Sequence, residues 1–187
     1  MSLDEIINGC LEGSNLHYDA LYKNYGGVLF GICLRYAKDR EQAADDFQEA
    51  FIKLFQQLKT YDKSRGNFEG WMKRIFVNHS IDTYRRRAKL RTSELKEVHE
   101  EFGQEDLQQP FPDLNNDQLV SLISELPDGY RVVFNLLAVE GMAHKEVAAV
   151  LNISENTSKS QFFKARKMLR EKIALQHSPI EINPYGA

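Results

Sequence analysis

Apolar residues recur every three or four positions along most of the chain, which is the spacing of one face of an amphipathic helix. In the first half this pattern predicts helices over about 1–13, 15–36, 40–58 and 68–89. No stretch of this half alternates apolar and polar residues as a half-buried strand does. The sequence therefore predicts an all-α fold.

The predicted helix over 40–58 has two contrasting faces. One face is an apolar stripe of the kind that packs on a core, made by Ala44, Phe47, Phe51, Leu54, Phe55 and Leu58. The opposite face is acidic and amide-bearing around Ile52, with Asp45, Gln48, Glu49, Lys53 and Gln56. Most such faces are simply solvated. An apolar residue among polar ones is also typical of a surface that binds a partner protein, and the pattern leaves both interpretations open.

The predicted helix over 68–89 is apolar on two sides, which is typical of a helix at the centre of a bundle. One side has Phe68, Trp71, Met72 and Ile75, and the other has Val77, Ile81 and Tyr84. The helix runs into five bases, Arg85, Arg86, Arg87, Lys89 and Arg91. Such a run can simply complement the helix dipole. Because it follows an aromatic-rich helix and a polar loop over 59–67, it also fits a surface that binds nucleic acid.

The second half contains the signals of a helix-turn-helix. Pro127 suits the first position of a helix, and Gly141 suits a left-handed C-terminal cap. A short helix follows over 144–151, and Asn152 suits the left-handed turn after it. Ser154 is then an N-cap for a longer, basic final helix. Two helices that meet through a tight turn in this way form a DNA-binding motif.

The final helix also has two predicted faces. Its core stripe is Ser158, Phe162, Ala165 and Leu169. The opposite side has Asn156, Lys159, Ser160, Phe163 and Lys167, with Lys164 beside it. Six bases between Lys159 and Lys172 face only one acid, Glu171. The charges alone fit a solvated face equally well. An outward Phe163 between bases favours DNA, where it could contact a thymine methyl in the major groove.

Composition divides the chain into two helical units. Residues 92–117 contain eight acids against one lysine, together with Pro110 and Pro112, and this predicts an acidic linker, extended or partly disordered. The expected domains are therefore 1–91 and 118–176, and we expect 177–187 to be a disordered tail.

Other features exclude several classes of protein. The net charge of −3 excludes a uniformly basic surface, so any contact with DNA must come from local patches. Cys10 and Cys33 are too few for a disulfide framework or a metal site. No apolar run could cross a membrane, the N-terminus is not a signal peptide, and a cytoplasmic location follows. No catalytic constellation or phosphate loop is evident, so we expect no enzyme activity, metal or cofactor.

Three motifs in the first half resemble region two of bacterial RNA polymerase sigma factors, in the small two-domain extracytoplasmic-function (ECF) group. They are AADDFQEAF at 43–51, W-x-x-R-I at 71–75 and N-x-x-x-D-x-x-R-R at 78–86. The second half resembles region four of the same family, through L-P-x-x-Y-R-x-V at 126–133 and the N-T-S-K-S and A-R-K-x-L-R strings from 156 to 170.

Some positions depart from the family pattern. Ala143 stands where the family usually has a capping Ser or Thr, at a cost of about 1 kcal/mol of helix stability. Asn156 and Ser158 replace the common Gly and Val. Gln161 replaces a frequent Arg, which exchanges a phosphate contact for a side chain that can read adenine. These departures affect the expected promoter sequence and leave the expected fold unchanged.

The resemblance implies a role for each candidate residue. Residues expected to dock on the clamp helices of the polymerase are Asp45, Asp46, Gln48, Glu49 and Ile52. Residues expected to bind and open the minus-ten element, partly by capturing a flipped base in the 59–67 loop, are Tyr61, Lys63, Ser64, Arg65, Asn67, Arg74, Asn78, Arg85 and Arg86. Residues expected to read the minus-thirty-five element are Asn156, Thr157, Lys159, Ser160, Gln161, Phe163, Lys164 and Lys167.

The resemblance therefore predicts a transcription initiation factor whose partners are core RNA polymerase, through its clamp helices and flap, and promoter DNA. Many members are held inactive by an anti-sigma protein, and the sequence leaves open whether this chain has one. The main alternative is a stand-alone helix-turn-helix regulator, which would need a two-fold dimer to bind two half-sites. A second alternative is an adaptor whose acidic helix binds only protein.

Overall fold

The computed structural model describes residues 1–90 and 116–177, and these are all in helices or short connections. In the first range the helices are α1 (Leu3–Leu11), α2 (Asn15–Tyr36), α3 (Arg40–Gln57) and α4 (Phe68–Leu90), with 3-10 turns η1 (Leu58–Thr60) and η2 (Lys63–Arg65) between α3 and α4. In the second they are α5 (Asn116–Ser124), α6 (Asp128–Phe134), the π-turn η4 (Asn135–Val139), α7 (His144–Leu151) and α8 (Glu155–His177). The all-α prediction is confirmed, and the expected linker and tail fall almost wholly outside the described residues.

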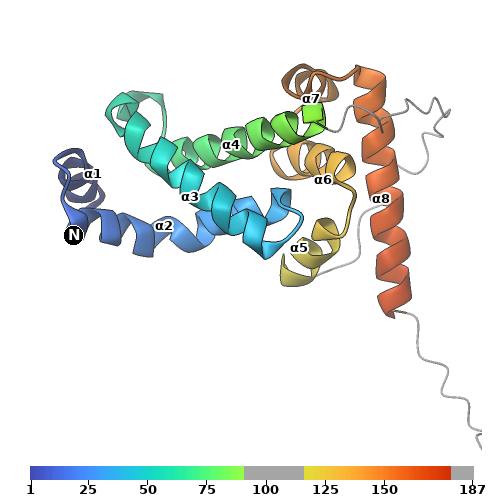
Figure 1. Ribbon diagram of the computed structural model, residues 1–187, viewed down its shortest axis with the longest axis horizontal. Helices are drawn as coiled ribbons and strands as arrows, with labels where there is room; N and C mark the ends of the chain where they lie inside the picture. The colour runs from blue at the N-terminus through green and yellow to red at the C-terminus, as the bar shows by residue number, and fades with distance from the viewer. Residues whose placement is uncertain (91–115, 178–187) are drawn as a thin grey trace, which may run out of the picture.

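Helices α2, α3 and α4 pack side by side as the N-terminal bundle, and α1 folds across one end of α2 (Figure 1). The expected stripe of α3 faces inward, and Phe47, Phe51 and Leu54 are buried. Phe76 of α4 lies at the centre, with its ring centroid 5.7 Å from Phe47 and 5.5 Å from Phe51. The prediction that α4 occupies the centre of a bundle is therefore confirmed, and Phe76 is a core residue that the pattern analysis missed.

The signals of the helix-turn-helix are also confirmed. Asn152 and Gly141 have φ values of 56° and 71°, in the left-handed region. The Ser154 hydroxyl accepts a hydrogen bond from the Thr157 amide at 2.9 Å and caps α8. Ala143 offers no such cap to α7, but the Glu146 carboxylate accepts a bond from the Ala143 amide at 2.7 Å. This bond makes up part of the cap that Ala143 lacks.

The C-terminal helices fold around a small core of their own, formed by Leu122, Ile123, Leu126, Phe134, Ala165, Leu169 and Ile173. The helix expected to begin at Pro127 differs in one respect. Regular α-helix ends at Phe134, and the chain widens into the π-turn Asn135–Val139. Such π-turns are rare and are frequently found at functional sites.

The two units are in contact. Helices α5 and α6 pack against α2, and α6 and α7 reach α4 (Figure 1). Val132, Val133 and Leu136 belong to the same buried cluster as the core of the N-terminal bundle. Sequence patterns suggested two modules joined only by a tether, whereas the structure has one apolar core running from the bundle into the second unit.

None of the described helices is long and apolar enough to cross a membrane.

Replacing Phe76 by Ala should lower the free energy of unfolding by about 3–5 kcal/mol, because it opens a cavity among aromatic rings that cannot collapse onto it. Urea titration followed by circular dichroism measures the loss. Ile52→Ala is the matched control on the same bundle, since Ile52 is 58% exposed, and it should change stability by no more than about 0.5 kcal/mol. Equal losses from the two substitutions would show that Phe76 is not the centre of the core.

Candidate nucleic-acid interface

The outward face of α3 presents most of the residues expected to bind a protein partner. Asp45, Gln48 and Glu49 are exposed, and Ile52 stands among them. Asp46 does not belong to this face, because only 4% of it is exposed. The α3 face, defined as Asp45, Gln48, Glu49 and Ile52, is therefore an apolar residue ringed by acid and amide groups.

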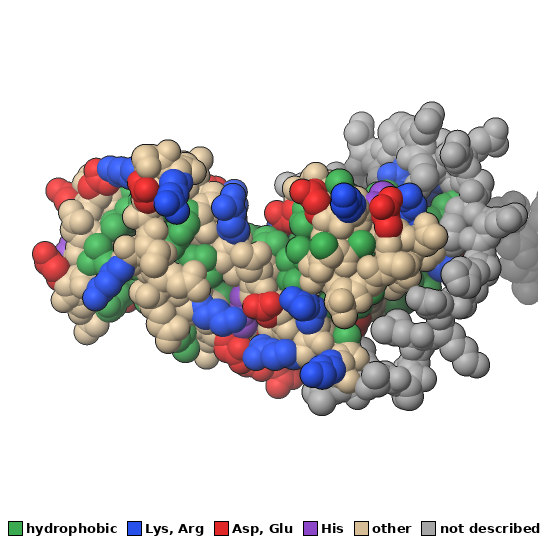
Figure 2. Space-filling view, turned by 90° about the horizontal axis from the view of Figure 1, so that it is seen from above, with side chains coloured by type: hydrophobic (Ala, Val, Ile, Leu, Met, Phe, Trp, Pro, Cys, Tyr) green, Lys and Arg blue, Asp and Glu red, His purple; other side chains and the backbone are tan. Residues whose placement is uncertain are grey.

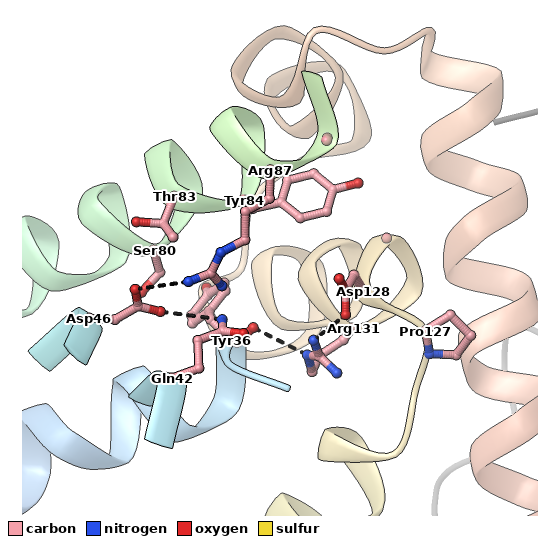
Figure 3. Close-up of a pocket in the computed structure, with 12 residues that line it drawn as sticks. Tyr36, Gln42, Asp46, Ser80, Thr83, Tyr84, Arg87, Pro127, Asp128 and Arg131 are labelled. Atoms are coloured by element: carbon pink, nitrogen blue, oxygen red, sulfur yellow. Dashed lines mark hydrogen bonds and ion pairs between the residues drawn. The ribbon is translucent and has the colours of Figure 1, made fainter. Parts of the chain in front are cut away.

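Asp46 instead joins α3 to the basic end of α4. Its carboxylate lies 3.5 Å from a guanidinium nitrogen of Arg87 and accepts a hydrogen bond from Nε2 of the Gln42 side chain at 3.4 Å (Figure 3). Burial raises the pKa of Asp46, and this outweighs the lowering effect of the Arg87 charge. Its position lets Asp46 orient Arg87 and removes its carboxylate from the exposed face of α3.

Glu49 also touches α4. Its carboxylate lies 3.5 Å from Arg86 and 3.7 Å from the Nε2 atom of His79, whose ring is buried. Burial lowers the pKa of His79, so the ring is neutral at pH 7 and does not form an ion pair with Glu49. Arg86 is the charged partner of Glu49, and its side chain also donates to the Thr83 hydroxyl at 3.0 Å.

The loop between α3 and α4 is organised by Asp62, a residue that the sequence analysis did not single out. Its carboxylate accepts bonds from the amide and hydroxyl of Ser64 at 2.9 and 2.7 Å and lies 3.4 Å from Arg65. Lys63 reaches Asp4 of α1 at 2.6 Å. The side chain of Asn67 caps α4 by accepting a bond from the Gly70 amide, also at 2.6 Å. Residues 62–67 are all exposed, so the loop presents polar edges from a fixed backbone.

An aromatic platform lies beside these polar edges. Tyr61 is half-buried, with its ring centroid 4.9 Å from that of Phe68 and 5.4 Å from that of Trp71. The Tyr61 hydroxyl donates to the carbonyl of Gly66 at 3.3 Å, which holds the ring against the loop. An aromatic group next to exposed donors and acceptors is the combination that an unstacked base requires.

On α4 the expected contact residues separate into two directions. Arg74, Asn78 and Arg85 are exposed at spacings of four and seven residues, so they share one face over roughly 17 Å of helix. Arg86 instead points toward Glu49 on α3. The sequence placed Arg85 and Arg86 together, but successive residues of a helix diverge by about 100°.

On α8 the expected recognition residues differ in exposure. Asn156, Lys159 and Lys167 are exposed, whereas Thr157, Ser160, Phe163 and Lys164 are half-buried. Lys159 pairs with Glu155 at 2.7 Å. Ser158 is fully buried, and its hydroxyl lies 3.0 Å from the Nδ1 atom of His144, so this departure from the family pattern joins α7 to α8.

Gln161 occupies a different environment from the one expected. Only 9% of it is exposed, and its carboxamide faces Gly129 of α6, where a Cβ atom would meet Gln161 Oε1 and the Tyr84 hydroxyl, each at 3.3 Å. Helices α4, α6 and α8 therefore meet at Gly129. In this conformation Gln161 is part of the contact between the units and is not presented to a DNA groove.

A cavity of about 230 Å³ lies between the two units (Figure 3). Arg87 and Tyr84 line it from α4, and Asp128 and Arg131 line it from α6. Arg131 is 2% exposed, and the sequence analysis did not treat it as functional. The sequence signal that could have singled out Arg131 was its place in the L-P-x-x-Y-R string.

Charges on the visible surface are mixed. Figure 2 shows Lys and Arg side chains interspersed with Asp and Glu and no continuous basic field. This agrees with the net charge of −3 and with contacts through local patches. The described residues contain no group of acids, histidines and cysteines suited to a metal ion.

Comparison with known proteins matches both halves of the chain. The family model for Sigma-70 region 2 matches residues 21–90, and that for Sigma-70 region 4 matches residues 116–169. Together these ranges cover more than half of the chain. The first match contains the α3 face, the loop and α4, and the second contains the helix-turn-helix and most of α8.

Relatives are similar over most of the chain. The ECF RNA polymerase sigma factor SigE of Mycolicibacterium smegmatis is 29% identical over 86% of this chain, which spans 63% of that relative, less than two thirds of its length. The ECF RNA polymerase sigma factor SigM of Bacillus subtilis is also 29% identical, over 81% of this chain and 92% of the relative. The RNA polymerase sigma-H factor of Pseudomonas aeruginosa is 26% identical, over 88% of this chain and 90% of the relative.

Among solved structures, CnrH in complex with the cytosolic domain of CnrY matches with a TM-score of 0.45 and 22% identity, covering 91% of this chain and 96% of that one. The sigma factor RpoE in complex with the anti-sigma factor NepR from Bartonella quintana matches with a TM-score of 0.48 and 17% identity. This match covers 84% of this chain and 97% of that one. The two family-model matches and the ECF relatives together show that this chain belongs to the sigma-70 family, in its ECF group.

Proposed function

We propose that this chain binds core RNA polymerase, directs it to a class of promoters and helps to open the minus-ten element. The observation that carries the proposal is the layout of the N-terminal bundle. The α3 face lies on the same bundle as the Arg74, Asn78 and Arg85 face of α4 and the aromatic loop, so one rigid unit can hold polymerase and DNA together. The helix-turn-helix supplies a second DNA contact.

The proposed unit boundaries are 1–91, 92–117, 118–176 and 177–187, as region two, linker, region four and tail. The protein acts in the cytoplasm, where its polymerase is, and catalyses no reaction itself. Free energy for opening the duplex comes from binding the unpaired strand. An anti-sigma protein is a further candidate partner, because RpoE of Bartonella quintana is found in a complex with one.

The α3 face docks on the polymerase clamp helices. Ile52 is 58% exposed and supplies the apolar centre, and Asp45, Gln48 and Glu49 surround it as the polar rim of a protein interface. Glu49 has a second role, because its contact with Arg86 links the docking face to the basic end of α4.

The minus-ten element is bound by the loop and by α4. Tyr61 supplies a surface on which a base can stack, and Lys63, Ser64, Arg65 and Asn67 supply polar edges next to it. Arg74, Asn78 and Arg85 contact the DNA backbone along the length of α4. On α8, Lys159 and Lys167 bind phosphate, and Asn156 and Ser160 lie on the same side, where they can reach base edges.

A stand-alone dimeric regulator is the competing function, and the two differ in what each needs to bind DNA. The regulator binds its site as a two-fold dimer without polymerase. The sigma factor binds tightly only as one copy with core polymerase. Tight dimeric binding by the free chain would contradict the proposal.

Glu49→Lys should weaken binding to core polymerase by roughly 100-fold, because it puts a positive charge against a partner surface that is complementary to a negative one. Run-off transcription on a promoter library, with purified core polymerase and the full chain, should fall in parallel. Asp19→Lys is the matched control, since it makes the same charge change at an exposed position of α2, and it should leave both measurements unchanged. If Glu49→Lys binds and transcribes normally, the docking surface lies elsewhere.

Tyr61→Ala should reduce the extent of promoter opening by roughly tenfold or more, because base–aromatic stacking contributes about 1–3 kcal/mol per base. The fluorescence of 2-aminopurine in the minus-ten element measures opening on a promoter found by the library assay. Tyr61→Phe keeps the ring and loses only the bond to Gly66, so it should open nearly as much DNA as the unmodified chain. Equal losses in the two variants would mean that the ring is not a stacking platform.

Lys159→Ala should weaken promoter binding by the holoenzyme and reduce the slope of log affinity against log salt by about one, since one phosphate contact is lost. Binding is measured by fluorescence anisotropy between roughly 50 and 200 mM salt. Lys23→Ala removes an exposed lysine from α2 and serves as the control. An unchanged slope in Lys159→Ala would exclude a phosphate contact at this residue.

A further inference from the structure

An acid stands among the proposed minus-ten contacts on α4. Asp82 is the acid of the N-x-x-x-D-x-x-R-R string, and it is exposed. It lies four residues after Asn78 and three before Arg85, so the three residues share one face of the helix. The face proposed to meet the minus-ten element therefore carries a carboxylate beside an amide and a guanidinium.

The arginine best placed to neutralise this carboxylate points away from it. Arg86 follows Asp82 by four residues, which is the spacing of an acid–base pair on a helix. Its guanidinium instead lies 3.5 Å from the Glu49 carboxylate on α3 and donates to the Thr83 hydroxyl at 3.0 Å. Within residues 1–90 and 116–177, the Asp82 carboxylate forms no ion pair or hydrogen bond. Asp82 is thus an available acceptor on the face proposed for DNA.

Such a carboxylate is unfavourable next to DNA unless the DNA offers it a hydrogen-bond donor. A duplex carries one negative charge for about every 1.7 Å of its axis. These charges repel a carboxylate over a screening length of about 8–10 Å at physiological salt. The sugar–phosphate backbone of DNA presents acceptors, so a donor for Asp82 has to come from the edge of a base.

Cytosine is the base that offers this donor most simply. In the major groove it presents its N4 amine with no acceptor beside it. Guanine presents two acceptors, thymine presents an acceptor and a methyl group, and adenine presents an acceptor next to its amine. An ionised carboxylate has no proton to give to these acceptors. A carboxylate therefore favours cytosine over the other three bases.

Asp82 and the aromatic loop meet different bases. Helix α4 begins at Phe68, beside the loop, and Asp82 lies about 21 Å farther along the helix at 1.5 Å per residue. The base that stacks on Tyr61 is therefore out of reach of Asp82. A base outside the opened segment keeps its Watson–Crick edge paired, and it shows the protein its major-groove edge.

We propose that Asp82 is a specificity-determining residue, which accepts a hydrogen bond from the N4 amine of a paired cytosine at or beside the minus-ten element. This inference rests on the proposed function. Asn78 and Arg85, as contacts to the DNA backbone on the same face, hold the carboxylate against the groove. Glu49 keeps Arg86 away from Asp82, so the acceptor stays available to the base.

The base preference of the holoenzyme tests this role. Promoter libraries randomised across and beside the minus-ten element are selected with core polymerase and the full chain, unmodified or with Asp82→Ala or Asp82→Asn. The unmodified chain should favour cytosine by about tenfold at one position, and Asp82→Ala should lose that preference. Asp82→Asn should shift it to adenine, because a carboxamide pairs with both N6 and N7 of that base. Asp19→Ala, the control, removes an exposed acid from α2 and should keep the cytosine preference.

A modified base separates a direct contact from a change in helix structure. N4-methylcytosine still pairs with guanine, but its methyl group replaces the amine proton that faces the major groove. At the selected position it should weaken promoter binding by the unmodified holoenzyme about tenfold and leave Asp82→Ala within about twofold. On a duplex of A·T pairs alone, Asp82→Ala should bind about threefold more tightly, since a repulsive charge is gone. Fluorescence anisotropy measures both affinities, and circular dichroism verifies that the variants are folded.

The outcomes distinguish this inference from the proposed function. A cytosine preference that is lost in Asp82→Ala, with a methyl effect confined to chains that keep Asp82, would support the inference. It is overturned if Asp82→Ala keeps the preference, or if the methyl group weakens both holoenzymes equally. A holoenzyme that selects promoters without any cytosine preference would also overturn it and leave the proposed function standing. A chain that neither binds core polymerase nor selects any sequence would refute the proposed function, and this inference with it.

Discussion

The guanidinium of Arg131 is the interaction on which the tertiary structure depends. A buried cation is costly unless its donors are satisfied and its charge is neutralised. Here the nitrogens reach three backbone carbonyls and the Asp128 carboxylate. Two of the carbonyls lie at the end of α5 and just after it, and the third ends α2. One side chain therefore fixes the entry into α6 and also ties the second unit to the first.

The same arrangement explains why the two units share a core. Val132, Val133 and Leu136 follow Arg131 on α6 and the π-turn, and they are buried against the N-terminal bundle. Their burial favours contact between the units but does not fix the relative orientation of the units, since apolar contact is not directional. Arg131 and Asn135 supply the direction, because their hydrogen bonds can form in only one register. The contact between the two units is thus an apolar contact aligned by two polar groups.

The sequence predicted the positions of the helices and their caps well. It predicted less well which polar side chains face solvent. Ser154, Asn152 and Gly141 act through their own backbone or through residues at most a few positions away, so their roles could be predicted. The α3 face was found from its period, apart from Asp46, which turns inward to Arg87. Gln161 looked like a reader of bases, but it is buried where three helices meet. Neither exception has a local signal, because each depends on a helix distant in sequence.

The sequence alone therefore determined the all-α class, the positions of the helices, the turn of the helix-turn-helix and the family, because these follow from side chains within about one helical turn and from contiguous motifs. Only the tertiary structure decided which polar groups are presented and which are used internally. The bonds from Arg131 to Tyr36, Asn135 to Arg35 and Arg35 to Glu140 join residues 95, 100 and 105 positions apart. Contacts at that separation depend on how whole helices pack, and no periodicity in the chain encodes them.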